Sequence, residues 1–473
     1  MLCRGPYSVP SYGDKDYSLK QEPVFAQSCL YEYFYNTPGT PTYDFHQRVY
    51  GGAPYGDFGP QFRAELYDPA QWADLFARAG ARYSYMTMKH GDGFCLFDSS
   101  TQPYWNSVVM GAHRDLYGDF VRAVKDRGLK AGVFVELSEA SNPLCPCEVL
   151  NATTGSRRWG NCSIHEDCAQ RENNCTLAFR DYLHTQIRES VERYSPDLVY
   201  LDDNCIANYQ PRNTSSDWFQ SQEFLAWIFN DSPVADAHFG EPHVVVNDRW
   251  GFAARGQHFN YHLCEDTRGS QLGYGCSPGF DPLHPTPAQK NDHWAWTFGL
   301  GLGFGYNRLE NATDYKSTRF ILGTLVQALA LGGNLEISLG PTHDGRIDNV
   351  VQQRLLEMGG WLEVNGEAVY GSTKWKTADG RDPSTAQNVT FTLQKKTGAV
   401  YAFVEGWHTA VSLAAPRPAT ASATVSLVGR PDLGPLAWTY SSTNSTLRIV
   451  MPDLHPESLS WGFFYVLRLS DFE

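Results

Sequence analysis

The sequence of 473 residues predicts a parallel (β/α) barrel followed by a smaller all-β domain. From about residue 70, helical and strand-like patterns alternate, which is typical of parallel βαβ units. Carboxylates and other polar side chains follow several predicted strands, as expected at the active-site face of a barrel. After about residue 375 the pattern changes to short alternating runs, which favours a β-sandwich. A doubly wound sheet is the alternative, but no G-x-G-x-x-G loop follows an early strand.

The elements of the barrel are expected in the following order. The first helix spans 68–81, with Asp68 as its N-cap and Pro69 behind it. A second helix spans 114–128 and ends at Gly128, and two more include residues 183–194 and 216–230. Barrel strands are predicted at 81–90, 129–137, 196–203, 243–251, 260–266 and 332–340. Runs at 388–396, 398–406 and 422–429 predict strands of the second domain.

We expect the barrel domain to span residues 1–375 and the β-sandwich 376–473, with a cysteine-rich insertion at 145–175. Five of the eleven cysteines lie in the insertion, without a paired C-x-x-C, which favours at least two disulfides over a zinc site. Sequons for N-glycosylation occur at Asn151, Asn161, Asn174, Asn213, Asn230, Asn311, Asn388 and Asn444. Together these features favour a secreted or lysosomal protein, although MLCRGPYSVPSYG lacks the features of a signal peptide.

Composition excludes several classes of protein. The net charge of −14 argues against nucleic acid as a partner. No apolar run reaches the length of a membrane-spanning helix. The aromatic content of 14% is compatible with a sugar-binding cleft or simply with a larger core. Whether identical chains associate stays open.

Residues 196–203, PDLVYLDD, form a predicted apolar strand that ends on Asp202 and Asp203. Side chains of a strand alternate between its faces, so only one of these carboxylates can face the barrel interior. Predicted strand ends also carry other acids, together with a histidine and an arginine. No Ser-His-Asp order is apparent, and no H-x-x-x-H pair lies on a predicted helix, as a metal site of that kind would require. Two carboxylates from different strands on one barrel face are what glycoside hydrolysis requires.

Long motifs now indicate a family. YDPAQWADLFARAGARYSYMTMKHGDGF, GAHRDLYGDFVRAVKDRGLKAGVF, PDLVYLDD, VVVNDRWG, LCEDTRG, GGNLEISLGPTHDG and WLEVNGEAVYGS resemble the α-L-fucosidases of glycoside hydrolase family twenty-nine, in order, from residue 5 to about 375. The resemblance implies a barrel followed by a β-sandwich, retention at the anomeric carbon, a fucosylated glycan as substrate and no metal or other cofactor.

The resemblance also implies roles for single residues. Asp202 matches the nucleophile of the family, and Asp266 matches the acid/base of the animal type, with the neighbouring Glu265 as the reserve candidate. Five further residues resemble ligands of the sugar: His90, Glu32, Tyr33, Tyr200 and Arg249. For Arg249 the alternative is a purely structural ion pair with Asp248, and for His90 a structural role within the barrel.

The sequence departs from the family at several of these places. Cys3-Arg4-Gly5 stands where the family has H-W-G, and nothing before it could form the first barrel strand. We therefore expect a gap between the second and the last barrel strands, beside His90 and Glu336. Gly91, Val135 and Ala295 stand at positions where the family has sugar ligands. These changes imply either an enzyme of altered specificity or a carbohydrate-binding homologue without turnover.

Overall fold

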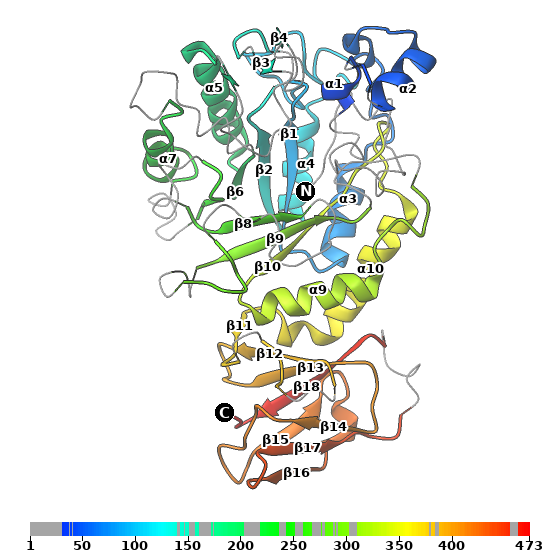
Figure 1. Ribbon diagram of the computed structural model, residues 1–473, viewed down its shortest axis with the longest axis vertical. Coiled ribbons are helices and arrows are strands. Elements are labelled where there is room, and N and C mark those ends of the chain that lie inside the picture. The colour runs from blue at the N-terminus through cyan, green and yellow to red at the C-terminus, as the bar shows by residue number, and fades with distance from the viewer. Residues whose placement is uncertain are drawn as a thin grey trace.

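The computed structural model describes residues 31–473 in part (Figure 1). The description leaves out residues 37, 40, 140–141, 146, 151–156, 160–171, 174, 203–217, 236–242, 251–258, 267–275, 277–279, 287–288, 290–291, 302–309, 378–379, 384–386 and 455–461. The remaining residues form a parallel barrel with helices around it, and a β-sandwich at one end of the long axis (Figure 1).

Two parallel sheets form the barrel wall. The first has the order β1 (Tyr83–Lys89), β2 (Lys130–Glu136), β6 (Leu198–Asp202) and β7 (Val245–Val246). The second has the order β8 (His262–Asp266), β9 (Trp294–Gly299) and β10 (Asn334–Ser338). Among the described residues, a parallel bridge between Asn247 and Tyr261 and hydrogen bonds between Val246 and Asn260 join the two sheets. The strand predictions are confirmed, except that β9 was not foreseen and that β7 is much shorter than the predicted 243–251.

The order of the described strands ends at β1 on one side and at β10 on the other. A cavity of about 580 Å³ lies between them, lined by residues 82–85 and 334–337 and by apolar side chains of the surrounding helices. The hydroxyls of Tyr83 and Tyr85 donate across this interval to the carboxylate of Glu336, at 3.1 and 2.6 Å. The gap expected from the sequence falls between these two strands, and residues 1–30, on which that expectation depends, lie outside the described residues.

Helices cover the outer face of the wall. They are α3 (Pro69–Arg78), α4 (Leu116–Asp126), α5 (Leu177–Tyr194), α7 (Ser221–Asn230), α9 (Thr318–Ala330) and α10 (Asn349–Asn365). Asp68 caps α3 as predicted, because its carboxylate accepts the N–H groups of Ala70 and Gln71 at 3.0 Å. Gly128 follows α4 with φ +71°, a left-handed conformation that glycine adopts without a steric penalty.

Strand alternation separates two cores. Val133, Val135, Val199 and Leu201 belong to the large apolar core that lies between the strands and the helices. The barrel interior holds a smaller cluster of mostly aromatic side chains, formed by Tyr85, Phe134, Tyr200, Tyr261, Leu263 and Ala295. Along each strand, side chains therefore face the barrel interior and the helices in turn. This alternation decides which polar side chains at the strand ends face the interior.

Additional elements lie near the end of the barrel at which the carboxyl ends of β1, β2 and β6 lie (Figure 1). They are α1 (Tyr31–Phe34), α2 (Pro41–Tyr50) and the 3₁₀ helix η5 (Tyr55–Phe58). The cysteine-rich insertion forms a small antiparallel sheet of β3 (Cys147–Leu150), β4 (Arg157–Trp159) and β5 (Glu172–Asn173). A disulfide between Cys145 and Cys175 closes the insertion at its base. The pairing of the three other cysteines of the insertion lies outside the described residues.

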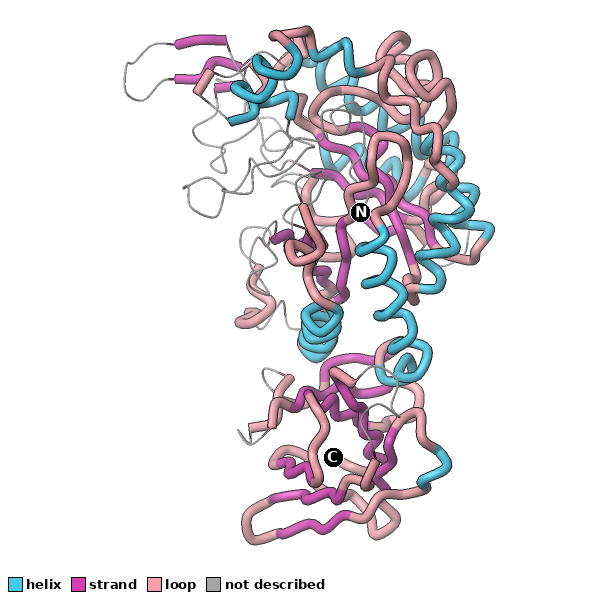
Figure 2. The backbone as a smooth tube through the Cα atoms, turned by 90° about the vertical axis from the view of Figure 1, so that its right-hand side faces the viewer, coloured by secondary structure: helices cyan, strands magenta, loops and turns pink. Residues whose placement is uncertain are grey.

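The C-terminal domain is a sandwich of two antiparallel sheets (Figure 2). One sheet contains β11 (Ser372–Lys374), β12 (Val389–Gln394), β13 (Val400–Glu405), β18 (Phe464–Ser470) and β15 (Thr424–Leu427). The other contains β14 (Ala410–Leu413), β17 (Thr446–Val450) and β16 (Trp438–Ser441). The 3₁₀ helices η7 (Gly366–Ala368) and η8 (Pro431–Leu433) complete the described elements. Trp361 of α10 donates its indole N–H to the carbonyl of Phe464 at 2.9 Å and so ties the domains together.

Candidate active site

Asp202 ends β6 on the interior face of the barrel. Tyr200, two residues earlier, packs in the interior, and Leu201 packs among the helices. The same alternation brings Asp202 to the inner side at the carboxyl end of the strand. Its side chain is 18% exposed, so the carboxylate is partly accessible to solvent. Asp203 lies outside the described residues.

Arg249 connects Asp202 to a second carboxylate. Its Nη1 donates to Asp202 Oδ1 and, at 2.5 Å, to Glu265 Oε2 on β8. The Arg249 and Glu265 side chains are only 13% and 10% exposed, so both charges are largely removed from water. Because one nitrogen donates both hydrogen bonds, the two acceptor oxygens lie within about 6 Å of each other. The structure thus brings together Asp202, Arg249 and Glu265, which are far apart in the sequence.

The site shifts the pKa values of Glu265 and Arg249. Burial raises the pKa of Glu265 to about 7, and the charge of Asp202 adds to this rise, whereas Arg249 opposes it. Burial alone would lower the pKa of Arg249, but Asp202 and Glu265 raise it well above its ordinary value. The site therefore contains a carboxyl group that is protonated in a large fraction of molecules near neutral pH, beside a permanent cation.

Strand β8 ends on two adjacent acids, Glu265 and Asp266, and the structure describes the side chain of Glu265 only. A strand directs only one of two successive side chains into the barrel, and Glu265 is the one that contacts Arg249. The side chain of Asp266 lies outside the description, although its main chain is part of β8. Cys264 faces the outer core and forms a disulfide with Cys276, which anchors β8 directly before Glu265.

Aromatic rings form the inner wall beside Asp202. Tyr200 stacks on Tyr85 with ring centroids 5.1 Å apart and lies 4.9 Å from Phe134. Burial, followed by the charge of Glu265, raises the pKa of Tyr200 well above its ordinary value, so its hydroxyl stays neutral. His90 lies parallel to Phe134 at 6.3 Å, and burial lowers the pKa of His90 to about 3. A neutral His90 can donate or accept a hydrogen bond.

One of the apparent departures from the family is corrected by this packing. Val135 stands where the family has an aromatic or histidine side chain, but it packs in the core between strands and helices. Phe134, one residue earlier, is the side chain of β2 that faces the interior and meets His90. Ala295 does face the interior, where it packs in the same cluster as Phe134.

Glu32 is buried near the end of β1. Its charge helps to raise the pKa of Tyr55, after burial and Asp92, which places Glu32 close to this tyrosine. Tyr55 in turn donates to Asp92 at 2.8 Å, two residues after His90. Helix α1 therefore contributes Glu32 to the region of His90. The side chain of Tyr33 lies outside the described residues.

Two further residues complete the description of the strand ends. Glu136 ends β2 in register with Asp202 and is buried, and its Oε1 accepts the N–H and hydroxyl of Ser138. Glu136 was not among the expected site residues, although its position at the end of a predicted strand could have indicated it. Asp248 pairs with His262 at 2.8 Å, while Arg249 pairs with Asp202 and Glu265. The structural ion pair considered for Arg249 is thus replaced by contacts across the site.

Comparison with known proteins decides the family. The family model described as alpha-L-fucosidase matches residues 4–367, and the model of the alpha-L-fucosidase C-terminal domain matches residues 381–470. This chain belongs to the α-L-fucosidase family. As a member it is a glycoside hydrolase, and the resemblance found in the sequence is confirmed.

Relatives agree with this placement. The tissue alpha-L-fucosidase of Rattus norvegicus is 31% identical over 475 residues, which cover 98% of this chain and 86% of that protein. The human tissue alpha-L-fucosidase is 31% identical with the same coverage. The alpha-fucosidase of Thermotoga maritima, solved with a mechanism-based inhibitor, superposes with a TM-score of 0.75 at 28% identity, covering 99% of this chain and 93% of that one. In the described part of this fucosidase-family chain, no helix is long and apolar enough to cross a membrane.

Proposed function

We propose that this enzyme hydrolyses α-L-fucosides with retention of configuration, with Asp202 as the nucleophile and Glu265 as the acid/base. The contact of Arg249 with both carboxylates carries the proposal, because it holds one oxygen of Asp202 and one oxygen of Glu265 within about 6 Å of each other. Retaining glycosidases hold their two carboxyl groups about 5–5.5 Å apart, whereas inverting enzymes leave about 6.5–9.5 Å for a water molecule. Convergence of two acids in one site also favours turnover over sugar binding alone.

The charges of the site suit the two roles. In the first step the Asp202 carboxylate attacks the anomeric carbon, the glycosidic bond breaks, and the proton of Glu265 passes to the leaving oxygen. In the second step Glu265, now ionised, removes a proton from water, which attacks the same carbon and releases Asp202. The raised pKa of Glu265, at about 7, supports a group that must be protonated first and ionised later. Arg249 keeps Asp202 from facing an uncompensated negative neighbour when Glu265 is ionised.

The sugar ligands are proposed from burial and position. Tyr200 and its aromatic neighbours offer an apolar surface for the sugar beside Asp202. His90 and Glu32 supply buried polar groups at the end of β1 for sugar hydroxyls. Arg249 contacts Asp202 and would therefore lie beside the sugar ring that Asp202 attacks. Tyr33 is retained as a ligand from the family resemblance.

We also propose fucosylated glycans as natural substrates and a secreted or lysosomal location. The disulfides Cys145–Cys175 and Cys264–Cys276 support an oxidising route, as do the sequons. The matched relatives are named as tissue and plasma fucosidases.

The test of the acid/base assignment compares Glu265→Ala with Asp266→Ala, the residue that the family resemblance favours. Rates are measured on an aryl fucoside with an activated leaving group and on one with a poor leaving group. Loss of the acid slows the poor leaving group far more, because the activated one departs without protonation. We expect this discrimination in Glu265→Ala only. Discrimination in Asp266→Ala alone would move the role to Asp266, and none in either would contradict an acid on this strand end.

A further inference from the structure

The strand that delivers Arg249 to the site is the shortest of the described barrel strands. It pairs with β6 over two residues, and on its other side Val246 hydrogen-bonds to Asn260 and Asn247 forms a bridge with Tyr261, both just before β8. A parallel ladder normally supplies the hydrogen bonds that hold neighbouring strands at a fixed distance. At the level of the active site, side chains that follow β7 make these connections instead.

Asn247 connects this segment to β6. Its side chain is fully buried, its Oδ1 accepts the N–H of Leu201 at 3.1 Å, and its Nδ2 donates to the carbonyl of Leu201 at 2.8 Å. An amide that donates and accepts at once reproduces the two bonds that a neighbouring strand would make. Leu201 directly precedes Asp202, so Asn247 holds the main chain that carries the nucleophile.

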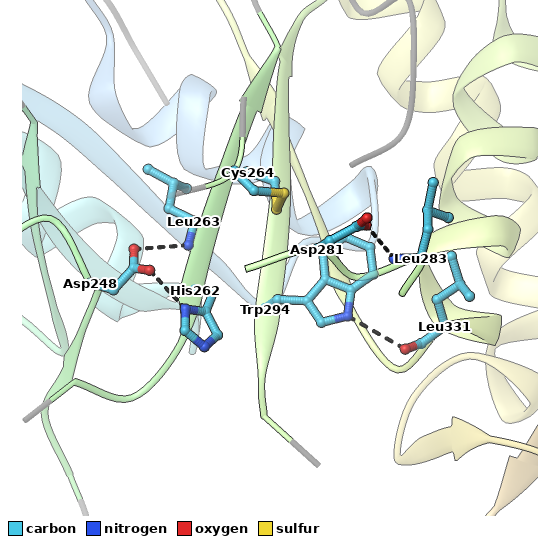
Figure 3. Close-up of a disulfide and its surroundings, with 9 residues drawn as sticks. Asp248, His262, Leu263, Cys264, Asp281, Leu283, Trp294 and Leu331 are labelled. Carbon is cyan, nitrogen blue, oxygen red and sulfur yellow. Dashed lines mark hydrogen bonds and ion pairs between the residues drawn. A yellow bond between two sulfur atoms is a disulfide. The ribbon is translucent and has the colours of Figure 1, made fainter. Parts of the chain in front are cut away.

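Asp248 makes the corresponding connection to β8 (Figure 3). Its Oδ1 accepts the N–H of Leu263 at 3.1 Å, and its Oδ2 lies 2.8 Å from Nδ1 of His262. His262 is held from its other side, where Nε2 lies 3.1 Å from Asp292. Leu263 is two residues before Glu265 and shares its interior face. Asp248 therefore holds the main chain that carries the second carboxylate.

We propose that Asn247 and Asp248 are positioning residues, which link β6 to β8 and thereby set the separation of Asp202 and Glu265. The inference rests on the proposed retaining mechanism, in which this separation matters. Residues 247–249 then each make a different connection between β6 and β8. Asn247 reaches β6, Asp248 reaches β8, and Arg249 bridges the two carboxylates that these strands carry.

The test uses Asn247→Ala and Asp248→Ala, with Asp197→Ala as the matched control. Asp197 is also a buried carboxylate that accepts an N–H from the neighbouring strand, that of Ala131 at 2.9 Å, and it pairs with Lys130 at 2.8 Å. It precedes β6 at the end remote from Asp202, so its removal costs stability without disturbing the site.

Rates on an activated aryl α-L-fucoside are measured together with the melting temperature. We expect Asn247→Ala and Asp248→Ala to lower kcat by about 10- to 100-fold with KM within about threefold, because misplaced reacting groups lose rate more than binding. Asp248→Asn keeps an oxygen for the N–H of Leu263 and should retain kcat within about threefold of wild type. Asp197→Ala should lower the melting temperature comparably and keep kcat within about twofold.

Two kinetic outcomes would overturn the link: wild-type kcat in both alanine variants at 247 and 248, or an equal loss in Asp197→Ala. A crystal structure of Asp248→Ala separates the link from the proposed function. The link predicts that Arg249 no longer contacts Asp202 and Glu265 together, whatever the wild-type enzyme hydrolyses, and an unchanged bridge would overturn it. A wild-type enzyme that cannot cleave fucosides would overturn the proposed function alone.

Discussion

At two places in the barrel, the described main-chain pairing between neighbouring strands is short or absent, and side chains connect the strands instead. The carboxylates at the two places have different partners. At the first, between β6 and β8, Asp202 and Glu265 share the cation of Arg249. Both acids are partly exposed to solvent, and burial and mutual repulsion hold the pKa of Glu265 at about 7. Charge is concentrated there and remains available to a substrate.

At the second place, between β10 and β1, one carboxylate meets only neutral donors. Glu336 accepts hydroxyl hydrogen bonds from Tyr83 at 3.1 Å and from Tyr85 and Thr297 at 2.6 Å. It is 4% exposed, and each of these bonds satisfies an oxygen that burial has removed from water. The contrast teaches that burial of an acid does not identify a catalytic group. Our assignment of the catalytic acids therefore rests on a second acid and a shared cation at the strand ends, not on burial.

The largest effect is expected at Asp202. Asp202→Ala should lower kcat at least about 10³-fold while the enzyme remains folded, because the covalent step loses its nucleophile. Azide should partly restore cleavage of an activated fucoside by entering the vacated space. Steady-state rates with and without azide, together with circular dichroism, check this. Activity near that of wild type would remove Asp202 from the mechanism.

The pH profile tests the other half of the pair. An acid must be protonated to act, so kcat/KM should fall as pH rises through about 7, the pKa of Glu265. This fall in kcat/KM at high pH should be absent when Glu265→Ala acts on a substrate with an activated leaving group. A descending limb that persists unchanged in this variant would assign the titration to another group.

Glu336→Gln sharpens the contrast between the two places. An amide replaces one acceptor oxygen with a donor, so one hydroxyl partner loses its bond, at a cost of about 1–3 kcal/mol in the free energy of unfolding. Because Glu336 is not one of the two proposed reacting carboxylates and its charge is only the last of the causes that raise the pKa of Glu265, kcat should stay within about threefold of wild type. Urea unfolding and steady-state rates measure the two quantities. A loss of kcat as large as that of Asp202→Ala would erase the distinction.

A smaller, pH-dependent effect is expected at Asp92, beside the end of β1. Burial raises the pKa of Asp92 to about 7, although hydrogen bonds from Tyr55 and Phe94 oppose the rise. A folded-state pKa above the unfolded value gives stability that is present below pH 4 and is lost as pH rises through 7. The melting temperature of Asp92→Asn, compared with wild type, should therefore improve from pH 4 to pH 8. An unchanged difference would place Asp92 in a more polar environment than the structure does.

Much of this architecture could be predicted from the sequence, because long helices and apolar strands carry strong patterns. Strand β9 was missed because Trp294–Gly299 is buried on both faces and shows no alternation. β7 was predicted too long because Asn247 and Asp248 replace the ladder, which no periodicity reveals. The remaining errors concern parity. Sequence alone did not show that Phe134 rather than Val135 faces the interior.

The same parity decides the site. Asp202 is proposed over its neighbour because the strand pattern and the family motif agree on it and because Leu201 packs outward. On β8 two adjacent acids fit the motif, and only the contact of Glu265 with Arg249 distinguishes them. That contact joins residues from separate strands, so it follows from the assembled barrel and not from local sequence.

The central claim, that Asp202 attacks the sugar from within this pair, is tested most directly by covalent labelling. A 2-deoxy-2-fluoro fucosyl donor with an activated leaving group should form a stable ester with the nucleophile, because the fluorine slows its hydrolysis. Peptide mapping by mass spectrometry then locates the label. The account predicts one sugar per chain on Asp202, and no label in Asp202→Asn. A label on Glu265 or on any other residue, or complete turnover without a trapped ester, would contradict it.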